Sequence, residues 1–277
     1  GKIVVDATDG ELRECKWQVV ESPRFFESMV VGRDYEEIHH IVSRICAICS
    51  VSHTLTSLKA TEDAMDVAVS EQDLALRKLG LYGEIIQSHV LHLGYLALPD
   101  LVGQKSVVPM AESHGDEVAT VVRLHRLGND LTEIVGGRSV HAQRPIPGGF
   151  SKLPTGPELT TIRNELDAAW EDLEAVTELL VSLADELPEF TRETEFISLR
   201  HPEEYAFYEG VPYSSDVGEL ATEDYESIVN EHVVEHSTAK FTKHARESYM
   251  VGALARLNNN YEQLSPRAKE IAESFGL

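Results

Sequence analysis

Two cysteines and a histidine lie close together in one short stretch of the chain, Arg44 to His53. Cys46 and Cys49 are separated by two residues, and His53 follows the second cysteine by four positions. Two thiolates bound to one metal lie about 4 Å apart, and a Cys-x-x-Cys turn gives that separation with little strain. Arg44 adds a positive charge that favours the thiolate form. The spacing therefore indicates a metal or cofactor site.

Two other interpretations of the cysteine pair stay open on spacing alone. A Cys-x-x-Cys can be a redox dithiol, but that motif usually lies between a strand and a helix of a thioredoxin-like unit, and no such unit surrounds this pair. Free cysteines can also pack in a core as small apolar residues. A structural zinc ion needs four ligands, whereas the local sequence offers three at most, so its fourth ligand would be remote.

The composition excludes several classes of partner. The chain has 277 residues, with 24 Lys and Arg against 47 Asp and Glu, which gives a net charge of −23. Such a surface repels phosphate backbones and anionic membranes, so we expect no nucleic-acid or lipid partner. Three cysteines are too few for a secreted disulfide framework. Without a membrane-spanning apolar run or a signal peptide, the sequence is expected to be cytoplasmic.

The elements that position the cysteine turn are expected to be mainly helical. Alternating residues on both sides of Asp9-Gly10 predict a β-hairpin over residues 2–20. Ser22-Pro23 predicts the start of a short helix that ends near Val31. Apolar spacing and caps predict further helices over 35–42, 52–69, 70–98, 113–135, 157–187, 223–234 and 265–277, the last still continuing at the end of the sequence.

The expected fold class is mainly α (α+β), with a long-helix bundle core, an N-terminal β-hairpin and small irregular β excursions. Short β segments are expected over 195–199, 205–215 and 240–244. A single domain, 1–277, is expected to contain the hairpin (1–21), a helical core with the cysteine turn (22–187) and a mixed α/β segment (188–277). The Gly/Pro-rich loop 137–157 lacks the flanking residues of a phosphate-binding loop.

Several motifs follow one another in a fixed order along essentially the whole chain. They are Pro23-Arg24-Phe25-Phe26-Glu27, Gly32-Arg33-Asp34, the Arg44–His53 stretch, Ser88-His89-Val-Leu-His92 with Leu98-Pro99-Asp100, Gly136-Gly137-Arg138 and Tyr249-Met-Val-Gly-Ala-Leu-Ala-Arg256. In order and wording they resemble the large subunit of nickel–iron hydrogenases. The resemblance is greatest to the cytoplasmic, multi-subunit branch, whose electron carriers are nicotinamide nucleotides, a deazaflavin or ferredoxin.

This resemblance implies roles for the residues singled out above. Cys46 would be a terminal nickel ligand, Cys49 would bridge nickel and iron, and His53 and Arg44 would tune the basicity of the sulfurs. Glu27 would bind a magnesium-type ion. The implied cofactor is a nickel–iron centre whose iron carries cyanide and carbon monoxide. The implied reaction is reversible cleavage of H₂ into protons and electrons, which pass to an iron–sulfur small subunit, and from there to further electron-transfer subunits.

The sequence also departs from the family. Ala47 and Phe25 replace glycines and Ala253 replaces a proline, which we interpret as variation within a branch. A second Cys-x-x-Cys near the family's C-terminus and an Arg-x-Glu-Gly-His motif, which would precede Gly1, are not in this sequence. We therefore expect that the chain alone does not hold the assembled centre. It would be the middle of a large subunit, taken from a longer chain or belonging to a split or degenerate form.

Two alternative functions remain open from the sequence. One is a non-catalytic scaffold related to the quinone-reductase subunit of respiratory complex I, although that subunit lacks the cysteines retained here. The other is an unrelated helical zinc-binding protein that uses Cys46, Cys49 and His53. The electron carrier, the direction of turnover and the number of subunits do not follow from the sequence.

Overall fold

The structure is a computed structural model that describes residues 1–21, 24–188 and 190–277. The chain divides into two compact units. The helical unit comprises Val30–Glu189 with Glu270–Leu277, and the mixed unit comprises Gly1–Met29 with Phe190–Lys269. Helices predominate, and the sheets are small, so the expected mainly α (α+β) class is confirmed. Within the described ranges, no helix has the length and apolar character that crossing a membrane would require.

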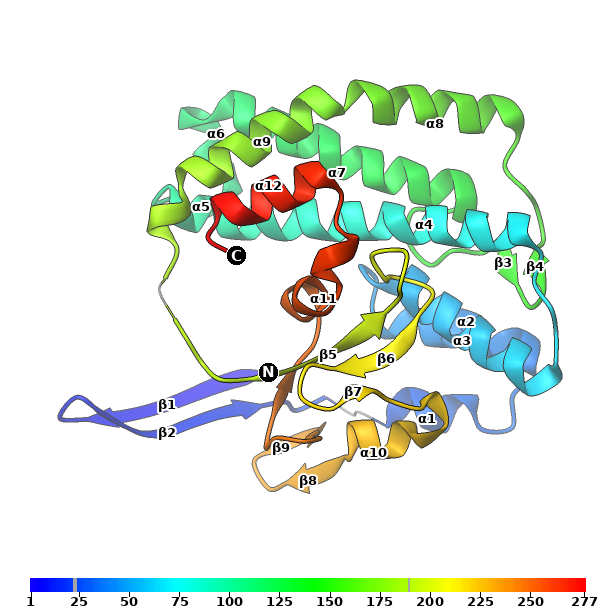
Figure 1. The fold of residues 1–277 in the computed structure, drawn as a ribbon, viewed down its shortest axis with the longest axis horizontal. Helices are drawn as coiled ribbons and strands as arrows, with labels where there is room; N and C mark the ends of the chain where they lie inside the picture. The colour runs from blue at the N-terminus through cyan, green and yellow to red at the C-terminus, as the bar shows by residue number, and fades with distance from the viewer. Residues whose placement is uncertain (22–23, 189) are drawn as a thin grey trace. The chain divides into compact units, whose positions relative to one another are not determined.

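Two long helices, α4 (Glu71–Val90) and α7 (Gly115–Gly136), form the centre of the helical unit and lie side by side (Figure 1). They approach closely because glycines face each other across the contact. A Cβ atom on Gly128 would lie 2.6 Å from the backbone nitrogen of Gln87, and one on Gly83 would lie 2.9 Å from that of Thr132. Only a hydrogen atom fits at these positions, so the two backbones set the spacing of the helices.

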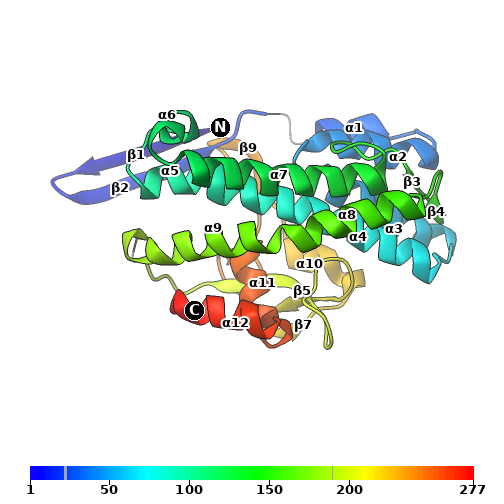
Figure 2. The same ribbon diagram turned by 90° about the horizontal axis from the view of Figure 1, so that it is seen from above.

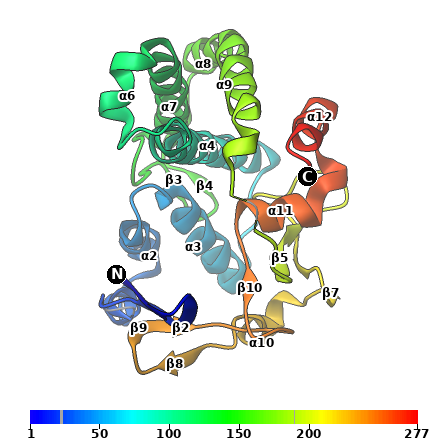
Figure 3. The same cartoon turned by 90° about the vertical axis from the view of Figure 1, so that its left-hand side faces the viewer.

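Shorter elements of the same unit surround this pair, as Figure 3 shows from another side. Buried Leu127 and Leu131 of α7 pack against Ile162 of the next helix to form a hydrophobic core. The remaining elements are α2 (Tyr35–Val42), η1 (Ser43–Ile45), α3 (Ser50–Met65), α5 (Leu98–Leu101), α6 (Val107–Ser113), α8 (Gly156–Ala168), α9 (Trp170–Ser182), η3 (Ala184–Glu186) and the strands β3 (Pro145–Ile146) and β4 (Gly149–Phe150).

The expected helix over residues 70–98 is regular only in its first part. Ser70 caps it as expected, since its Oγ accepts a hydrogen bond from the backbone of Asp73 at 3.1 Å. After α4 the chain widens into a π-helical segment, η2 (Leu91–Ala97), and then continues as α5. Pro99 does not end the helix, because it lies in the first turn of α5, where a missing N–H is tolerated. Within η2, Gly94 lets the backbone approach the side chain of Val121.

The expected single helix over residues 157–187 is wrong in one respect. It breaks at Ala169 into α8 and α9, which Figure 2 shows as two successive helices alongside α7. No glycine or proline marks the break, so the apolar periodicity alone could not reveal it. Ile162 on α8 is buried, whereas Leu173 on α9 is 43% exposed and lines an apolar cavity of about 250 Å³. The packing of α8 against the central helices therefore differs from that of α9.

Two helix boundaries in this unit also differ from the expected ones. α3 ends at Met65 instead of residue 69, because Asp66 takes the left-handed conformation (φ 53°) that stops a helix. α7 begins at Gly115, after the separate short helix α6, and ends at a left-handed Gly137 as expected.

In the mixed unit, the expected N-terminal hairpin is confirmed as β1 (Lys2–Thr8) paired with β2 (Glu11–Gln18). Asp9 and Gly10 both have positive φ, as a tight turn between such strands requires. Ile3 pairs with Trp17 and Val5 with Cys15, so apolar side chains share one face, and that face is exposed. The C-terminal end of β2 is tied to β9 (Ser237–Phe241), since Ser237 Oγ accepts from Val19 N at 3.1 Å.

A four-stranded sheet, in the order β10-β5-β6-β7, contains the expected strand at residues 195–199. Helix α11 packs on its strand β5. The elements of this unit are α1 (Phe25–Val30, whose last residue is assigned to the helical unit), β5 (Glu195–Arg200), β6 (Val211–Ser214), β7 (Gly218–Glu219), η4 (Thr222–Asp224), α10 (Tyr225–Val229), β8 (His232–Val234), β9, β10 (Tyr249–Met250), α11 (Ala253–Asn260) and η5 (Tyr261–Gln263). The expected cap of α1, Ser22-Pro23, lies outside the described residues.

The expected helix over residues 223–234 is wrong in its second half. It ends at Val229, because Asn230 takes a left-handed conformation (φ 35°), and the following residues pair as β8 with β9. Of the extended segment expected at 240–244, only the first two residues belong to a strand. The last helix, α12 (Pro266–Ser274), begins as expected but ends before Leu277, since Gly276 has φ 75°.

Candidate functional site

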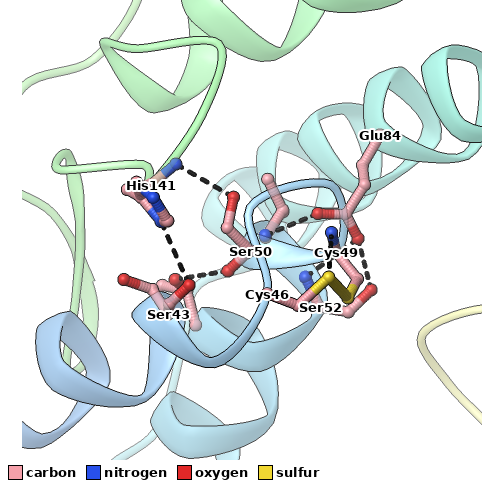
Figure 4. Close-up of a disulfide and its surroundings, with 9 residues drawn as sticks. Ser43, Cys46, Cys49, Ser50, Ser52, Glu84 and His141 are labelled. Atoms are coloured by element: carbon pink, nitrogen blue, oxygen red, sulfur yellow. Dashed lines mark hydrogen bonds between the residues drawn. A yellow bond between two sulfur atoms is a disulfide. The ribbon is translucent and has the colours of Figure 1, made fainter. Parts of the chain in front are cut away.

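The cysteine turn lies between η1 and α3, so it is held between helices as expected. Cys46 and Cys49 are half-buried, and their sulfurs are joined as a disulfide across a Cα–Cα distance of 5.4 Å (Figure 4). The backbone N–H of Cys49 points at the sulfur of Cys46, at 3.3 Å. The turn therefore places both sulfurs side by side at the N-terminal end of α3, where helix amides carry partial positive charge.

A buried carboxylate from α4 holds the start of α3. Glu84 is only 5% exposed, and its Oε2 accepts from the backbone N–H of Val51 at 2.6 Å. Its Oε1 accepts from the backbone N–H of Ser52 at 3.1 Å and also from the Ser52 hydroxyl (Figure 4). Cys49 occupies the N-cap position of α3 without a capping side-chain bond, so Glu84 supplies the acceptors that a cap would normally provide. Burial raises the pKa of Glu84.

A second set of contacts holds the opposite side of the turn. The backbone N–H of His141 donates to Ser50 Oγ at 2.9 Å, and its ring Nδ1 lies 3.0 Å from the carbonyl oxygen of Ser43 (Figure 4). Ser43 and Ser50 flank the cysteines in sequence and are fully buried. His141 comes from the Gly/Pro-rich loop and has a positive φ of 58°. The Gly/Pro-rich loop thus fixes both ends of the cysteine turn, and this contact is a structural role for the loop.

The other residues expected around the sulfurs lie on the same segment. Arg44 is exposed on η1. The pKa values of His40 and His141 are lowered first by the burial of each histidine and then by the positive charge of Arg44. His53 is half-buried in the first turn of α3, and its backbone N–H donates to the Cys49 carbonyl at 3.2 Å. Burial lowers the pKa of His53, so the imidazole is neutral at physiological pH.

Glu27, the expected ligand of a magnesium-type ion, belongs to the mixed unit. It lies on α1 with its side chain 55% exposed and forms an ion pair with Arg24, whose Nε donates to Glu27 Oε2 at 2.7 Å. The Arg24 hydrogen bond lowers the pKa of this carboxyl. In the structure Glu27 is therefore a surface carboxylate engaged by its neighbour in sequence.

The described residues do not by themselves fit a complete bimetallic centre. Throughout residues 1–21, 24–188 and 190–277, no group of three or more His, Cys, Asp or Glu side chains is arranged to hold a metal ion. The cysteine turn supplies two sulfur donors, and the third cysteine, Cys15, is exposed on the hairpin of the other unit. The turn fits one half of a site with four thiolates.

Sequence reasoning missed the residues that hold the turn. In the sequence, Glu84 is one of several polar residues on a long helix, and His141 belongs to a loop without a recognisable catalytic or metal-binding motif. One signal for Glu84 was present, because it follows Gly80 and Gly83. Small residues at that spacing indicate a helix face in close contact with a neighbour, where a carboxylate must find partners.

Comparison with known proteins identifies the family. Residues 24–130 match the model of the nickel-dependent hydrogenase family. The chain is 34% identical over 275 residues to the alpha subunit of sulfhydrogenase 1 from Pyrococcus furiosus, covering 99% of this chain and 64% of that protein. It is 30% identical over 298 residues to a vhu subunit of the F420-non-reducing hydrogenase from Methanocaldococcus jannaschii, covering 99% of this chain and 71% of that protein.

A solved structure shows the same fold over nearly the whole chain. The structure of an NAD⁺-reducing [NiFe]-hydrogenase in the H₂-reduced state superimposes with a TM-score of 0.87 and 26% identity, covering 97% of this chain and 65% of that one. The chain thus spans less than two thirds of the Pyrococcus relative and of this hydrogenase chain. The chain does cover more than two thirds of the Methanocaldococcus relative, to which it is 30% identical. The chain therefore belongs to the family of nickel-dependent hydrogenase large subunits.

Proposed function

We propose that this chain is part of the catalytic large subunit of a nickel–iron hydrogenase, which cleaves H₂ reversibly into protons and electrons. The observation that carries the proposal is the Cys46–Cys49 turn. It is retained in a chain that belongs to the hydrogenase family, and it presents two sulfurs side by side at the start of a helix. A scaffold that had lost its metal site would have no need of either cysteine.

In this proposal, a dithiol of the cell reduces the Cys46–Cys49 disulfide and is itself oxidised to a disulfide, and the two cysteine thiols that result lose their protons when they bind metal. Cys46 would be a terminal ligand of nickel and Cys49 a bridge between nickel and iron, and further donors would complete the site. Soft thiolates suit both metals. When bound, the centre would supply Lewis-acid and redox chemistry toward H₂. Arg44 and His53 would adjust the surroundings of the sulfurs, and Glu27 would bind a magnesium-type ion after releasing Arg24.

The electrons would pass to a partner subunit that carries iron–sulfur clusters, within a cytoplasmic complex. Two relatives, the alpha subunit of sulfhydrogenase 1 and the HoxS beta subunit of an NAD-reducing hydrogenase, are by name parts of multi-subunit enzymes, which supports this expectation. The strongly negative surface of the chain also favours a different protein as partner over a second copy of itself.

The test uses the native complex that contains this chain. Metal analysis should find nickel and iron in stoichiometric amounts, and hydrogen should reduce an artificial electron acceptor. Replacing Cys46 or Cys49 by Ser should remove most of the nickel and lower hydrogen uptake at least about 100-fold, because a lost ligand disrupts the centre. Cys15→Ser is the matched control and should change neither measurement, since Cys15 lies exposed on the hairpin. Full nickel content in both ligand variants would refute the proposal.

A further inference from the structure

The geometry points to Glu84 as the positioning residue of the cysteine turn. We infer that its carboxylate fixes the first turn of α3 and thereby holds the two sulfurs at the separation they need. The inference rests on the proposed function in one point, which is that the two sulfurs must be close together in order to bind the metals. The hydrogen bonds of Glu84 go to Val51 and Ser52, so it acts on the sulfurs through these two residues.

The hydrogen bonds of the Glu84 carboxylate all go to the first turn of α3. Both carboxylate oxygens accept hydrogen bonds from the start of α3, at the two residues that follow Ser50. Glu84 forms no ion pair with a basic side chain in the described parts of the chain. A buried carboxylate without a cation is costly, and it is tolerated when several donors converge on it. Here those donors belong to the segment that carries the cysteines.

The position of the carboxylate explains why it controls the turn. The first amides of a helix have no partner within the helix, and they need an acceptor to keep the first turn from fraying. Cys49 directly precedes α3 and offers no capping oxygen. Without Glu84, the N–H groups of Val51 and Ser52 would have to turn toward water. The backbone of Cys49 would move with them, because it is joined to the same turn.

A thiol–disulfide equilibrium measures this positioning without any metal. The reduced chain is equilibrated with glutathione disulfide, and each Cys46–Cys49 bond that forms releases two molecules of glutathione. The equilibrium constant reports how well the fold holds the two thiols together. Glu84→Ala should lower it about tenfold, which is equivalent to about 30 mV in the reduction potential. Glu84→Gln keeps one carbonyl acceptor and should restore part of the effect. Backbone hydrogen exchange should become faster at Val51 and Ser52 in Glu84→Ala.

Glu62→Gln provides the matched control. Glu62 is also a buried carboxylate of the same unit, but it lies near the far end of α3 and binds Arg77. Its replacement destabilises oxidised and reduced chains alike, so the equilibrium constant should not change. A shift of equal size in both variants would overturn the inference, because loosening of the unit would then account for it. An unchanged constant in Glu84→Ala would also overturn it, whereas nickel content in the native complex tests the proposed function separately.

Discussion

Glu62 and Arg77 form a buried two-point ion pair that joins α3 to α4. Arg77 Nη1 lies 2.8 Å from Glu62 Oε2 and Nη2 lies 2.5 Å from Oε1, while Arg77 and Glu62 are 1% and 6% exposed. Arg77 also donates to the carbonyl oxygen of Ile146, and Gly148 N donates to Glu62 Oε1 at 2.8 Å. The pair thus connects the C-terminal end of α3 and the N-terminal half of α4 with the β3–β4 turn, far along α3 from the cysteines.

Breaking this ion pair should strongly destabilise the helical unit. Arg77→Ala leaves the carboxylate of Glu62 buried without its cation, and such a loss typically costs about 3–5 kcal/mol of the free energy of unfolding. Urea denaturation followed by circular dichroism measures it. Arg126→Ala is the control, since Arg126 pairs with Asp130 on the surface and its loss should cost less than about 0.5 kcal/mol. Similar losses in both variants would contradict the buried role.

The close approach of α4 and α7 predicts opposite effects for two glycine substitutions in the same helix. Gly128→Ala would place a methyl group against the backbone of Gln87, so the helices must move apart, at a cost of about 1–3 kcal/mol or more. At Gly115, nothing lies within 4 Å of an added Cβ, and alanine should raise the free energy of unfolding by up to about 1 kcal/mol. Thermal denaturation compares the two. A neutral Gly128→Ala variant would be inconsistent with the packing.

The sequence allowed the hairpin, the capped start of α4, the end of α7 and the helical setting of the cysteine turn to be predicted. These features depend on local signals such as Asp9-Gly10, Ser70 and Gly137, which act within a few residues. The break at Ala169 depends on packing against distant helices, so periodicity could not show it. The supports of the turn, Glu84 and His141, are likewise distant in sequence from the cysteines. Spacing could identify the sulfurs but not what holds them.

Buried histidine should make the stability of the helical unit depend on pH. His39 is 2% exposed, and burial, followed by the charges of His40 and Arg77, lowers its pKa to about 4. The unfolded chain binds a proton near pH 6.5, whereas the folded chain does so only near pH 4. Stability is therefore fully present above about pH 6.5 and falls as the pH decreases from about 6.5 to about 4, by up to about 3 kcal/mol.

Urea denaturation at a series of pH values between about 4 and 8 measures this loss. His39→Leu cannot bind a proton in either state, so its stability should fall less steeply over the same interval. His92→Gln, at an exposed position of the same unit, is the matched control variant. A wild-type profile that is flat over this interval would show that His39 takes up its proton as easily in the folded chain as in the unfolded one.

In the mixed unit, Glu195 accepts hydrogen bonds from several segments of the chain, and we expect its replacement to destabilise them. It is fully buried on β5, and it accepts from Ser214 Oγ at 2.6 Å, lies 2.6 Å from His244 Nδ1, and accepts from the backbone of Ala245 and Arg246. Burial would raise the pKa of Glu195, but these hydrogen bonds lower it below its ordinary value. The stability it contributes is thus present above about pH 4.5 and lost at lower pH.

Removing this carboxylate should therefore release the segment that follows β9. Glu195→Ala leaves the N–H groups of Ala245 and Arg246 without their acceptor, and the lost hydrogen bonds should cost about 3–5 kcal/mol in total. Hydrogen exchange at those two amides should become faster by at least about tenfold, while the exposed Glu219→Gln variant should keep wild-type rates. If the two amides stayed protected in Glu195→Ala, other contacts would hold this segment, and Glu195 would be only one acceptor among several.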